Sequence, residues 1–160
     1  MLAGMTAGPI ELRWARDEGD VRVAFEIRDR VFCVEQGVPR DEEIDALDEQ
    51  ALHLLAVERD EAGERALGTL RLLLEGERAR IGRVAVEVEE RHRGVASRML
   101  QLALARAGEE GVAHVRLASQ IVAAPLYERA GFAVESEPFD DAGIPHVWMA
   151  RSLAPLPPSG

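Results

Sequence analysis

The sequence predicts a mixed α/β fold. We expect one domain, residues 1–152, with a single central twisted mixed sheet of about six to seven strands flanked by helices. The first reason is size, because 160 residues, 47% of them hydrophobic, suffice for one core without a disulfide or metal. The second is the order of periodicities, which runs strand, helix, several strands, helix, strand, helix and strands. The third is that no repeat or linker interrupts residues 9–152.

Each expected strand is a short stretch in which apolar residues alternate with polar ones or form a block between turn residues. The ranges are 10–14, 51–59, 66–75, 79–88, 113–118, 132–136 and 144–151. Residues 60–64, with Gly63, are typical of a hairpin turn between the second and third strands. The strand over 79–88 alternates most clearly in its second half, where valines occupy every other position.

The first helix follows the first strand. Asp17 or Asp20 is expected to cap it, and it extends to about residues 35–36, where a glycine and then a proline stop it. The next stretch, 38–50, is acidic and predicted to be irregular, with one helical turn.

Two more helices are expected in the second half of the chain. One covers about 94–108 and presents one apolar face, and the other covers about 123–130 and ends at Gly131. The proline-rich tail, residues 153–160, is predicted to be disordered.

Composition narrows the classes of function. A single cysteine, Cys33, excludes an internal disulfide, and with only four scattered histidines we expect no metal site. No apolar run approaches the ~18 residues of a membrane span. Residues 1–20 lack a basic start followed by an apolar block, so we expect a cytoplasmic protein rather than a secreted one.

The net charge is also informative about partners. The formal charge is -10, from 29 acidic and 19 basic residues, and every basic residue is an arginine. Nucleic acids and anionic membranes are therefore poor partners, and a cationic substrate is favoured over an anionic one. Any anion bound by a side-chain cation would meet a guanidinium fork, which suits phosphate.

The segment 84–99 (VAVEVEERHRGVASRM) contains the clearest chemical signal. A strand is followed by a short turn with two arginines, and Gly94 opens a helix. A helix N-terminus has free N–H groups and a partial positive charge, and glycine lets the backbone approach a ligand closely. These residues fit a phosphate site, with Ser97 as a hydroxyl donor. A plain strand-to-helix turn with solvated arginines fits them equally well.

Two blocks of sequence resemble the GCN5-related N-acetyltransferase (GNAT) superfamily. Residues 91–96 (RHRGVA) are similar to its R/Q-x-x-G-x-G/A loop, which binds the pyrophosphate of acetyl-CoA. Residues 124–132 (APLYERAGF) resemble the helix and strand start that follow in that family, at the same spacing.

A narrower resemblance is to the ElaA-like branch of that superfamily. Residues 31–36 (VFCVEQ), followed by Asp45, Asp48 and His53, are similar to one of its patterns, and residues 143–149 (GIPHVWM) to another. Many members of the superfamily have an asparagine seven residues before the tyrosine, where this chain has Gln120. An amide remains available for hydrogen bonding there.

The resemblance implies a cofactor site without a metal. The strand over 79–88 would splay from the strand over 113–118, and the pantetheine arm of acetyl-CoA would pair with backbone in the gap. A backbone N–H at the strand end would polarise the thioester oxygen. The implied cofactor-binding residues are Val84, Ala85, Val86, Arg91, His92, Arg93, Gly94, Val95, Ala96, Ser97, Gln120 and Tyr127.

Acetyl transfer to an amine also needs a general acid and a general base. The resemblance makes Tyr127, the only tyrosine, the acid that protonates the CoA thiolate. Glu35, Glu87 and His146 are candidates for the base or for an anchor of the amine, and histidine titrates near neutral pH. Asp48 and His53 are interpreted as structural residues that hold the stretch 38–50 in place.

The sequence therefore predicts an acetyl-CoA-dependent N-acetyltransferase. The acidic surface and the carboxylates of 41–49 suit a primary amine acceptor that is a small cationic amine or a peptide amine. The alternative is a non-catalytic acyl-CoA-binding or regulatory module of the same fold. A homodimer is compatible with the sequence, which does not decide the oligomeric state.

Overall fold

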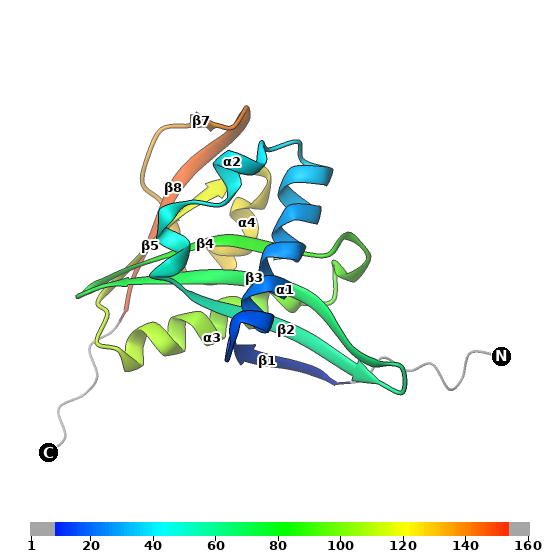
Figure 1. Ribbon diagram of the computed structural model, residues 1–160. Helices are drawn as coiled ribbons and strands as arrows, with labels where there is room; N and C mark the ends of the chain where they lie inside the picture. The colour runs from blue at the N-terminus through cyan, green and yellow to red at the C-terminus, as the bar shows by residue number, and fades with distance from the viewer. Residues whose placement is uncertain (1–8, 154–160) are drawn as a thin grey trace, which may run out of the picture.

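The structure is a computed structural model that describes residues 9–153, and its strands form one mixed sheet (Figure 1). The strand order is β1-β2-β3-β4-β5-β8-β6, with β7 paired to β8. The strands are β1 (Ile10–Trp14), β2 (Leu52–Asp60), β3 (Gly63–Glu75), β4 (Arg78–Val86), β5 (His114–Gln120), β6 (Ala133–Val134), β7 (Phe139–Asp141) and β8 (Ile144–Ser152). The mixed α/β prediction is confirmed, with eight strands in place of six to seven. The predicted disordered tail lies, from residue 154 on, outside the described residues.

Helical segments lie in three of the connections between consecutive strands, β1 to β2, β4 to β5 and β5 to β6. The α-helices are α1 (Glu18–Arg28), α2 (Arg40–Glu43), α3 (Val95–Glu109) and α4 (Ala124–Arg129). The π-helix η1 (Asp29–Glu35) continues α1, and 3-10 turns form η2 (Ala46–Glu49), η3 (Val88–Glu90) and η4 (Ile121–Ala123). No helix of the described range is both long enough and apolar enough to cross a membrane.

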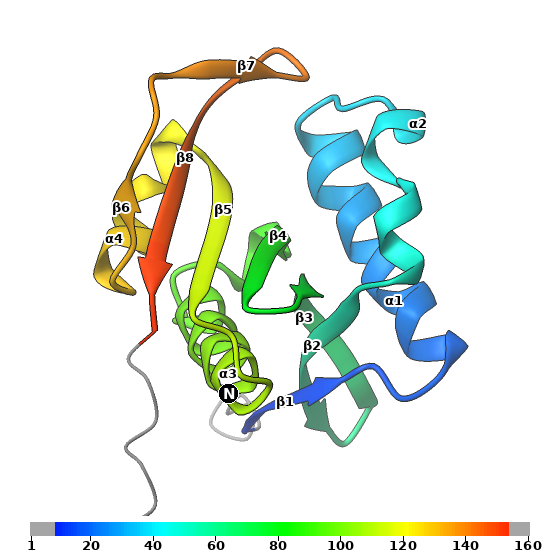
Figure 2. The same ribbon diagram turned by 90° about the vertical axis from the view of Figure 1, so that its left-hand side faces the viewer.

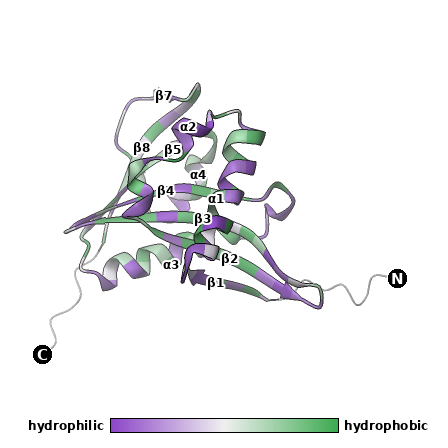
Figure 3. Cartoon of the chain, viewed as in Figure 1, coloured by the Kyte–Doolittle hydropathy of each residue, from purple (hydrophilic) through white to green (hydrophobic). Residues whose placement is uncertain are grey.

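The two faces of the central strands bury different hydrophobic clusters. Neighbouring residues of a strand point to opposite faces, so Leu54 packs with residues of α3 and Leu55 packs with residues of α1. Figure 2 shows α1 and α2 on one side of β2–β4 and α3 on the other. In Figure 3 the middle of β2 and β3 is hydrophobic, whereas their shared hairpin end is hydrophilic.

Three local expectations from the sequence need correction. The strand predicted over 79–88 ends earlier, at Val86, where the pairing of β4 with β3 stops. Val88, the last of the alternating valines, belongs to η3. The stretch 38–50 contains two helical turns, α2 and η2, where the sequence predicts one. Asp45 caps η2 by accepting a hydrogen bond from Leu47 N at 3.0 Å. The predicted strand ranges leave out β7, a short strand between β6 and β8, whose Phe139 stacks on Trp148.

The start of α1 distinguishes the two proposed capping residues. Asp17 is the N-cap, because its side chain accepts a hydrogen bond from Asp20 N at 2.9 Å. The Asp20 carboxylate instead pairs with Arg13 of β1, also at 2.9 Å. That hydrogen bond from Arg13 lowers the pKa of Asp20 to about 2.

Candidate active site

The strands β4 and β5 separate along their length. They pair only between Arg78–Arg80 and His114–Arg116, after which β5 pairs with β8 alone. Figure 2 shows β5 leading away from β4 beyond this contact. The splay implied by the resemblance is therefore present, and the far half of β4 has a free edge to which an extended amide chain could bind.

A cleft of about 990 Å³ follows this opening. It has polar and apolar walls, and its volume suits a small-molecule site. Among the residues expected to bind the cofactor, those lining it are Val84, Ala85, Val86, Arg91, His92, Gly94, Val95, Ala96, Ser97, Gln120 and Tyr127. The exception is Arg93.

The loop before α3 presents unpaired backbone donors to the cleft. His92 and Gly94 both have left-handed backbones, with φ of 66° and 75°. Gly94 is the N-cap of α3, and no side chain bonds to the N–H groups of the first turn. A Cβ at Gly94 would meet nothing within 4 Å, so the space beside it belongs to the cleft. Such a loop and helix start form an anion-binding concavity.

The two arginines of this loop have different surroundings. Arg91 lines the cleft, donates to the carbonyl of Val86 at 3.1 Å, and forms a two-point ion pair with Glu35 at 2.7 Å. Arg93 is not among the residues that line the cleft, and it pairs with Glu58 and Glu90. Both of these carboxylates are buried, and a buried carboxylate needs a cation. The guanidinium of Arg93 is therefore engaged by them, and the structure does not have it in the place expected beside the anion.

Tyr127 lies on the wall of the cleft. Its side chain is largely buried and packs edge-on against Phe132, with the ring centres 6.3 Å apart. Within residues 9–153 its hydroxyl has no hydrogen-bond partner. Burial raises the pKa of Tyr127, so the phenol stays protonated and able to donate at neutral pH.

His146 faces Gln120 across the pairing of β8 with β5, and both line the cleft. Its Nδ1 lies 2.7 Å from the carbonyl oxygen of Ile144. A carbonyl only accepts, so Nδ1 bears the hydrogen and Nε2 of the neutral ring keeps a lone pair. Phe139 stacks on the ring at 5.8 Å and restricts its orientation.

Gln120 is hydrogen-bonded to a second glutamine that lines the cleft. Its amide nitrogen donates to the side-chain oxygen of Gln36 at 2.8 Å, and Gln36 also lines the cleft. Gln36 belongs to the stretch 31–36 that resembles the ElaA-like branch, but the resemblance implied no role for it. Its signal was the polar pair that ends an otherwise apolar helical segment.

Neither of the two glutamates proposed as bases lines the cleft. The hydrogen bond from Arg91 lowers the pKa of Glu35, which keeps the carboxylate ionised and weakens it as a base. Glu87 is engaged by Arg30 at 3.0 Å. The geometry therefore favours His146 over both glutamates.

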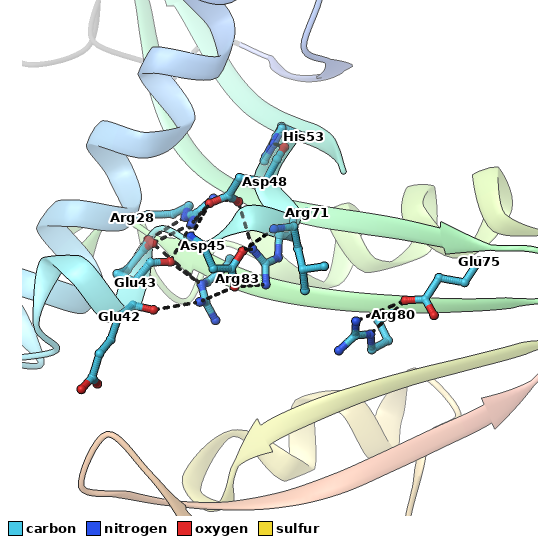
Figure 4. Close-up of polar contacts among 11 residues, drawn as sticks. Arg28, Glu42, Glu43, Asp45, Asp48, His53, Arg71, Glu75, Arg80 and Arg83 are labelled. Atoms are coloured by element: carbon cyan, nitrogen blue, oxygen red, sulfur yellow. Dashed lines mark hydrogen bonds and ion pairs between the residues drawn. The ribbon is translucent and has the colours of Figure 1, made fainter. Parts of the chain in front are cut away.

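A buried ionic cluster, drawn in Figure 4, borders the cleft, because its members Glu43, Asp45 and Arg71 are among the lining residues. Arg28 is 1% exposed and donates to Glu43 at 2.6 Å and to Asp48 at 2.7 Å. Arg71 donates to Asp45 at 2.7 Å and to Asp48 at 2.9 Å. The cluster thus ties α1, α2, η2 and β3 together.

The same cluster supports the structural reading of Asp48 and His53. The backbone carbonyl of Asp48 lies 3.0 Å from Nε2 of His53, so the histidine holds η2 against β2. Burial alone would raise the pKa of Asp48, but hydrogen bonds from Arg28 and Arg71 outweigh it and lower that pKa to about 2.

These pairings remove one argument for a cationic acceptor. Glu43, Asp45 and Asp48 make up much of the acidic segment 41–49, and each is already bonded to an arginine. The segment therefore offers much less free negative charge than its sequence suggests.

Comparisons with known proteins agree on one family. Residues 16–153 match the family model described as "Acetyltransferase (GNAT) domain". The uncharacterized N-acetyltransferase YjcF of Bacillus subtilis is 33% identical over 138 residues, which are 86% of this chain and 96% of YjcF. The crystal structure of Escherichia coli ElaA superposes with a TM-score of 0.78 at 25% identity, covering 89% of this chain and 99% of that one. A GNAT acetyltransferase of Elizabethkingia anophelis with acetyl-CoA bound shares the fold, with a TM-score of 0.69 at 15% identity over 90% of this chain and 98% of that one.

Proposed function

The chain belongs to the GNAT acetyltransferase family, and from this premise we propose that it transfers an acetyl group from acetyl-CoA directly to the nitrogen of a primary amine. The observation that supports this most is the continuity of one cleft. It joins an uncapped helix start, the free edge of β4, a buried tyrosine and a histidine. The cytoplasmic location and the homodimer stay predictions.

The donor would lie along β4. The first-turn N–H groups of α3 and the side chain of Arg91 would hold the pyrophosphate, and the backbone of Val84–Val86 would pair with the pantetheine amides. The fold neighbour that holds acetyl-CoA supports this donor. To meet a phosphate, Arg91 would have to share its fork with Glu35 or release that residue.

The reaction needs two proton transfers, one from the protein to sulfur and one from the nitrogen to the protein. As the amine forms a C–N bond to the acetyl carbon, the C–S bond breaks and its electron pair stays on sulfur. Tyr127 would then protonate the sulfur, and His146 Nε2, directly or through one water, would take the proton that the nitrogen loses. The products are an N-acetyl amine and free CoA.

We expect Gly94→Glu to lower the affinity for acetyl-CoA by more than about tenfold, or ~1.4 kcal/mol. The new carboxylate would stand in the space beside the helix start, where the pyrophosphate is proposed to bind. Calorimetric titration with acetyl-CoA measures the change.

Gly94→Ala is the matched control for that variant. It imposes the same cost of about 1–2 kcal/mol for a left-handed backbone but adds no charge. Affinity within a few-fold of wild type is expected for the alanine variant. An unchanged affinity in the glutamate variant would refute this placement of the pyrophosphate.

The rate should rise from about pH 6 towards about pH 8–9. Alkyl amines have pKa values near ~10, so the attacking amine must first be made neutral, and the base that takes its proton, or water feeding that base, becomes competent over this range. If His146 is the base, His146→Ala should abolish this rise and leave the affinity for acetyl-CoA unchanged. Initial rates of CoA release across the pH range measure it.

Two outcomes of the pH experiment would correct the proposal. A rise that persists in His146→Ala would pass the base role to Glu35, Glu87 or ordered water. A flat wild-type profile with rate-limiting chemistry would contradict transfer to an amine.

The alternative is a module that binds acyl-CoA without turnover. The presence of Tyr127 argues against this alternative, since a protein that only binds acyl-CoA has no need of a group that protonates a thiolate. Sustained CoA release in the presence of a panel of amines distinguishes the two functions, because a binding module would release none.

A further inference from the structure

Arg83 sits at a β-bulge in the wall of the cleft. Arg71 of β3 pairs with Gly82 of β4, but Thr69 pairs with Ala85, so β4 has one extra residue between these pairs. Arg83 adopts a left-handed backbone there, with φ of 52°. Such a conformation is costly for a residue with a side chain, and bulges near active sites redirect side chains.

The bulge directs Arg83 to the α2 face of the sheet. In a regular strand, residues 82 and 83 would point to opposite faces. Instead, Arg83 Nε donates to the carbonyl of Glu43 at 3.1 Å and Nη2 lies 3.4 Å from the carbonyl of Glu42. Figure 4 shows the guanidinium reaching α2 from β4. The residue lines the cleft beside the backbone of Val84–Val86.

Arg83 has no close carboxylate partner to itself. Its nearest carboxylate oxygens are Asp45 Oδ2 at 3.3 Å and Glu43 Oε2 at 3.8 Å. Asp45 already pairs with Arg71 at 2.7 Å, and Glu43 pairs with Arg28 at 2.6 Å. Within the described part of the chain, Nη1 of Arg83 has no hydrogen-bond partner. Burial, and then the nearby charge of Arg71, lower the pKa of Arg83.

We infer that the acceptor is a small amine that also bears a carboxylate, and that Arg83 binds this carboxylate in the cleft. The inference rests on the proposed acetyl transfer and names its substrate class. A guanidinium fork with a free Nη1 suits a planar carboxylate, and a partly desolvated cation gains from an anionic partner. Arg83 lies on β4 itself, directly before Val84–Val86, along which the donor is proposed to bind, so one short molecule would meet both Arg83 and the acetyl group.

The test uses amines with and without the negative charge. Glycine, β-alanine and 4-aminobutyrate are each compared with the corresponding carboxamide by kcat/KM for CoA release. We expect wild type to prefer at least one carboxylate over its carboxamide by roughly tenfold or more. In Arg83→Met this ratio should fall by a similar factor, because the variant keeps an unbranched side chain and loses the charged fork.

Arg80→Met is the matched control. Arg80 lies on the same strand and lines the same cleft, but it is exposed and pairs with Glu75 at 3.2 Å. Its ratio should stay at the wild-type value. The ratio compares two substrates of one variant, so a general structural disturbance cancels. If Arg83→Met does not fold, Arg83→Lys serves instead and should give an intermediate ratio, since it keeps the charge without the fork.

The outcomes separate the inference from the function on which it rests. A wild-type preference for carboxamides, or a ratio that survives in the Arg83 variants, would overturn the inference while acetyl transfer stands. Equal losses for Arg80→Met and Arg83→Met would overturn it too, since the effect would then be one of general charge. No turnover with any amine, despite acetyl-CoA binding, would refute the acetyltransferase proposal and the acceptor class together.

Discussion

Tyr127→Phe is expected to lower kcat roughly 10²-fold, about 2.7 kcal/mol, within the range of a positioned general acid. The hydroxyl is needed only as charge develops on sulfur, so its removal should affect the transition state more than binding. The ring keeps its packing against Phe132, and burial already keeps the phenol protonated. Steady-state kinetics with the best amine measures the effect.

The KM for acetyl-CoA is the internal control for this variant. It should change by only a few-fold, because the proposed pyrophosphate and pantetheine contacts lie elsewhere in the cleft. Thermal unfolding should match wild type. A variant with nearly full kcat would mean that water protonates the thiolate, and Tyr127 would then be a packing residue.

Arg28→Met should lower the free energy of unfolding by about 3–5 kcal/mol, the usual effect of removing one partner from a buried ion pair. The arginine is 1% exposed, and its loss would leave the carboxylates of Glu43 and Asp48 buried with fewer partners. Denaturation in urea at neutral pH measures the loss.

Arg40→Met is the control for that loss. Arg40 also pairs with a carboxylate, Asp29 at 2.6 Å, but its side chain is 71% exposed. An exposed pair contributes little to stability, so the loss in Arg40→Met should be much smaller than in Arg28→Met. Similar losses in the two variants would contradict the role given to the buried cluster.

The same cluster predicts how stability depends on pH. The folded pKa of Asp48, about 2, lies below the unfolded value of ~3.9. Its contribution to stability is therefore present above the unfolded pKa and lost as the pH falls through the folded one. Unfolding of wild type should become easier from about pH 5 to pH 2, and this slope should be shallower in Arg28→Met, where the pKa of Asp48 is less depressed.

The sequence by itself determined the fold and most of the proposed donor side of the cleft. The loop of residues 91–97 and the segment around Tyr127 are contiguous stretches, so their residue types and spacing are visible without any tertiary contact. Gly94 at the start of α3 is a local signal of the same kind, because a left-handed N-cap depends on its own backbone. Even the bulge at Arg83 left a trace, since a glycine inside a strand, here Gly82, often marks one.

Only the tertiary structure decided which charged groups are available to a ligand. Arg91 pairs with Glu35, Arg93 turns to Glu58, and Arg83 reaches α2, although these partners lie at least 35 residues apart in the chain. An arginine side chain is long and flexible, and its partner is set by which carboxylates the packed elements bring within reach and leave buried. No local propensity encodes that choice, so the acidic segment 41–49 looked free in the sequence, whereas in the fold half of its carboxylates, Glu43, Asp45 and Asp48, are paired with arginines.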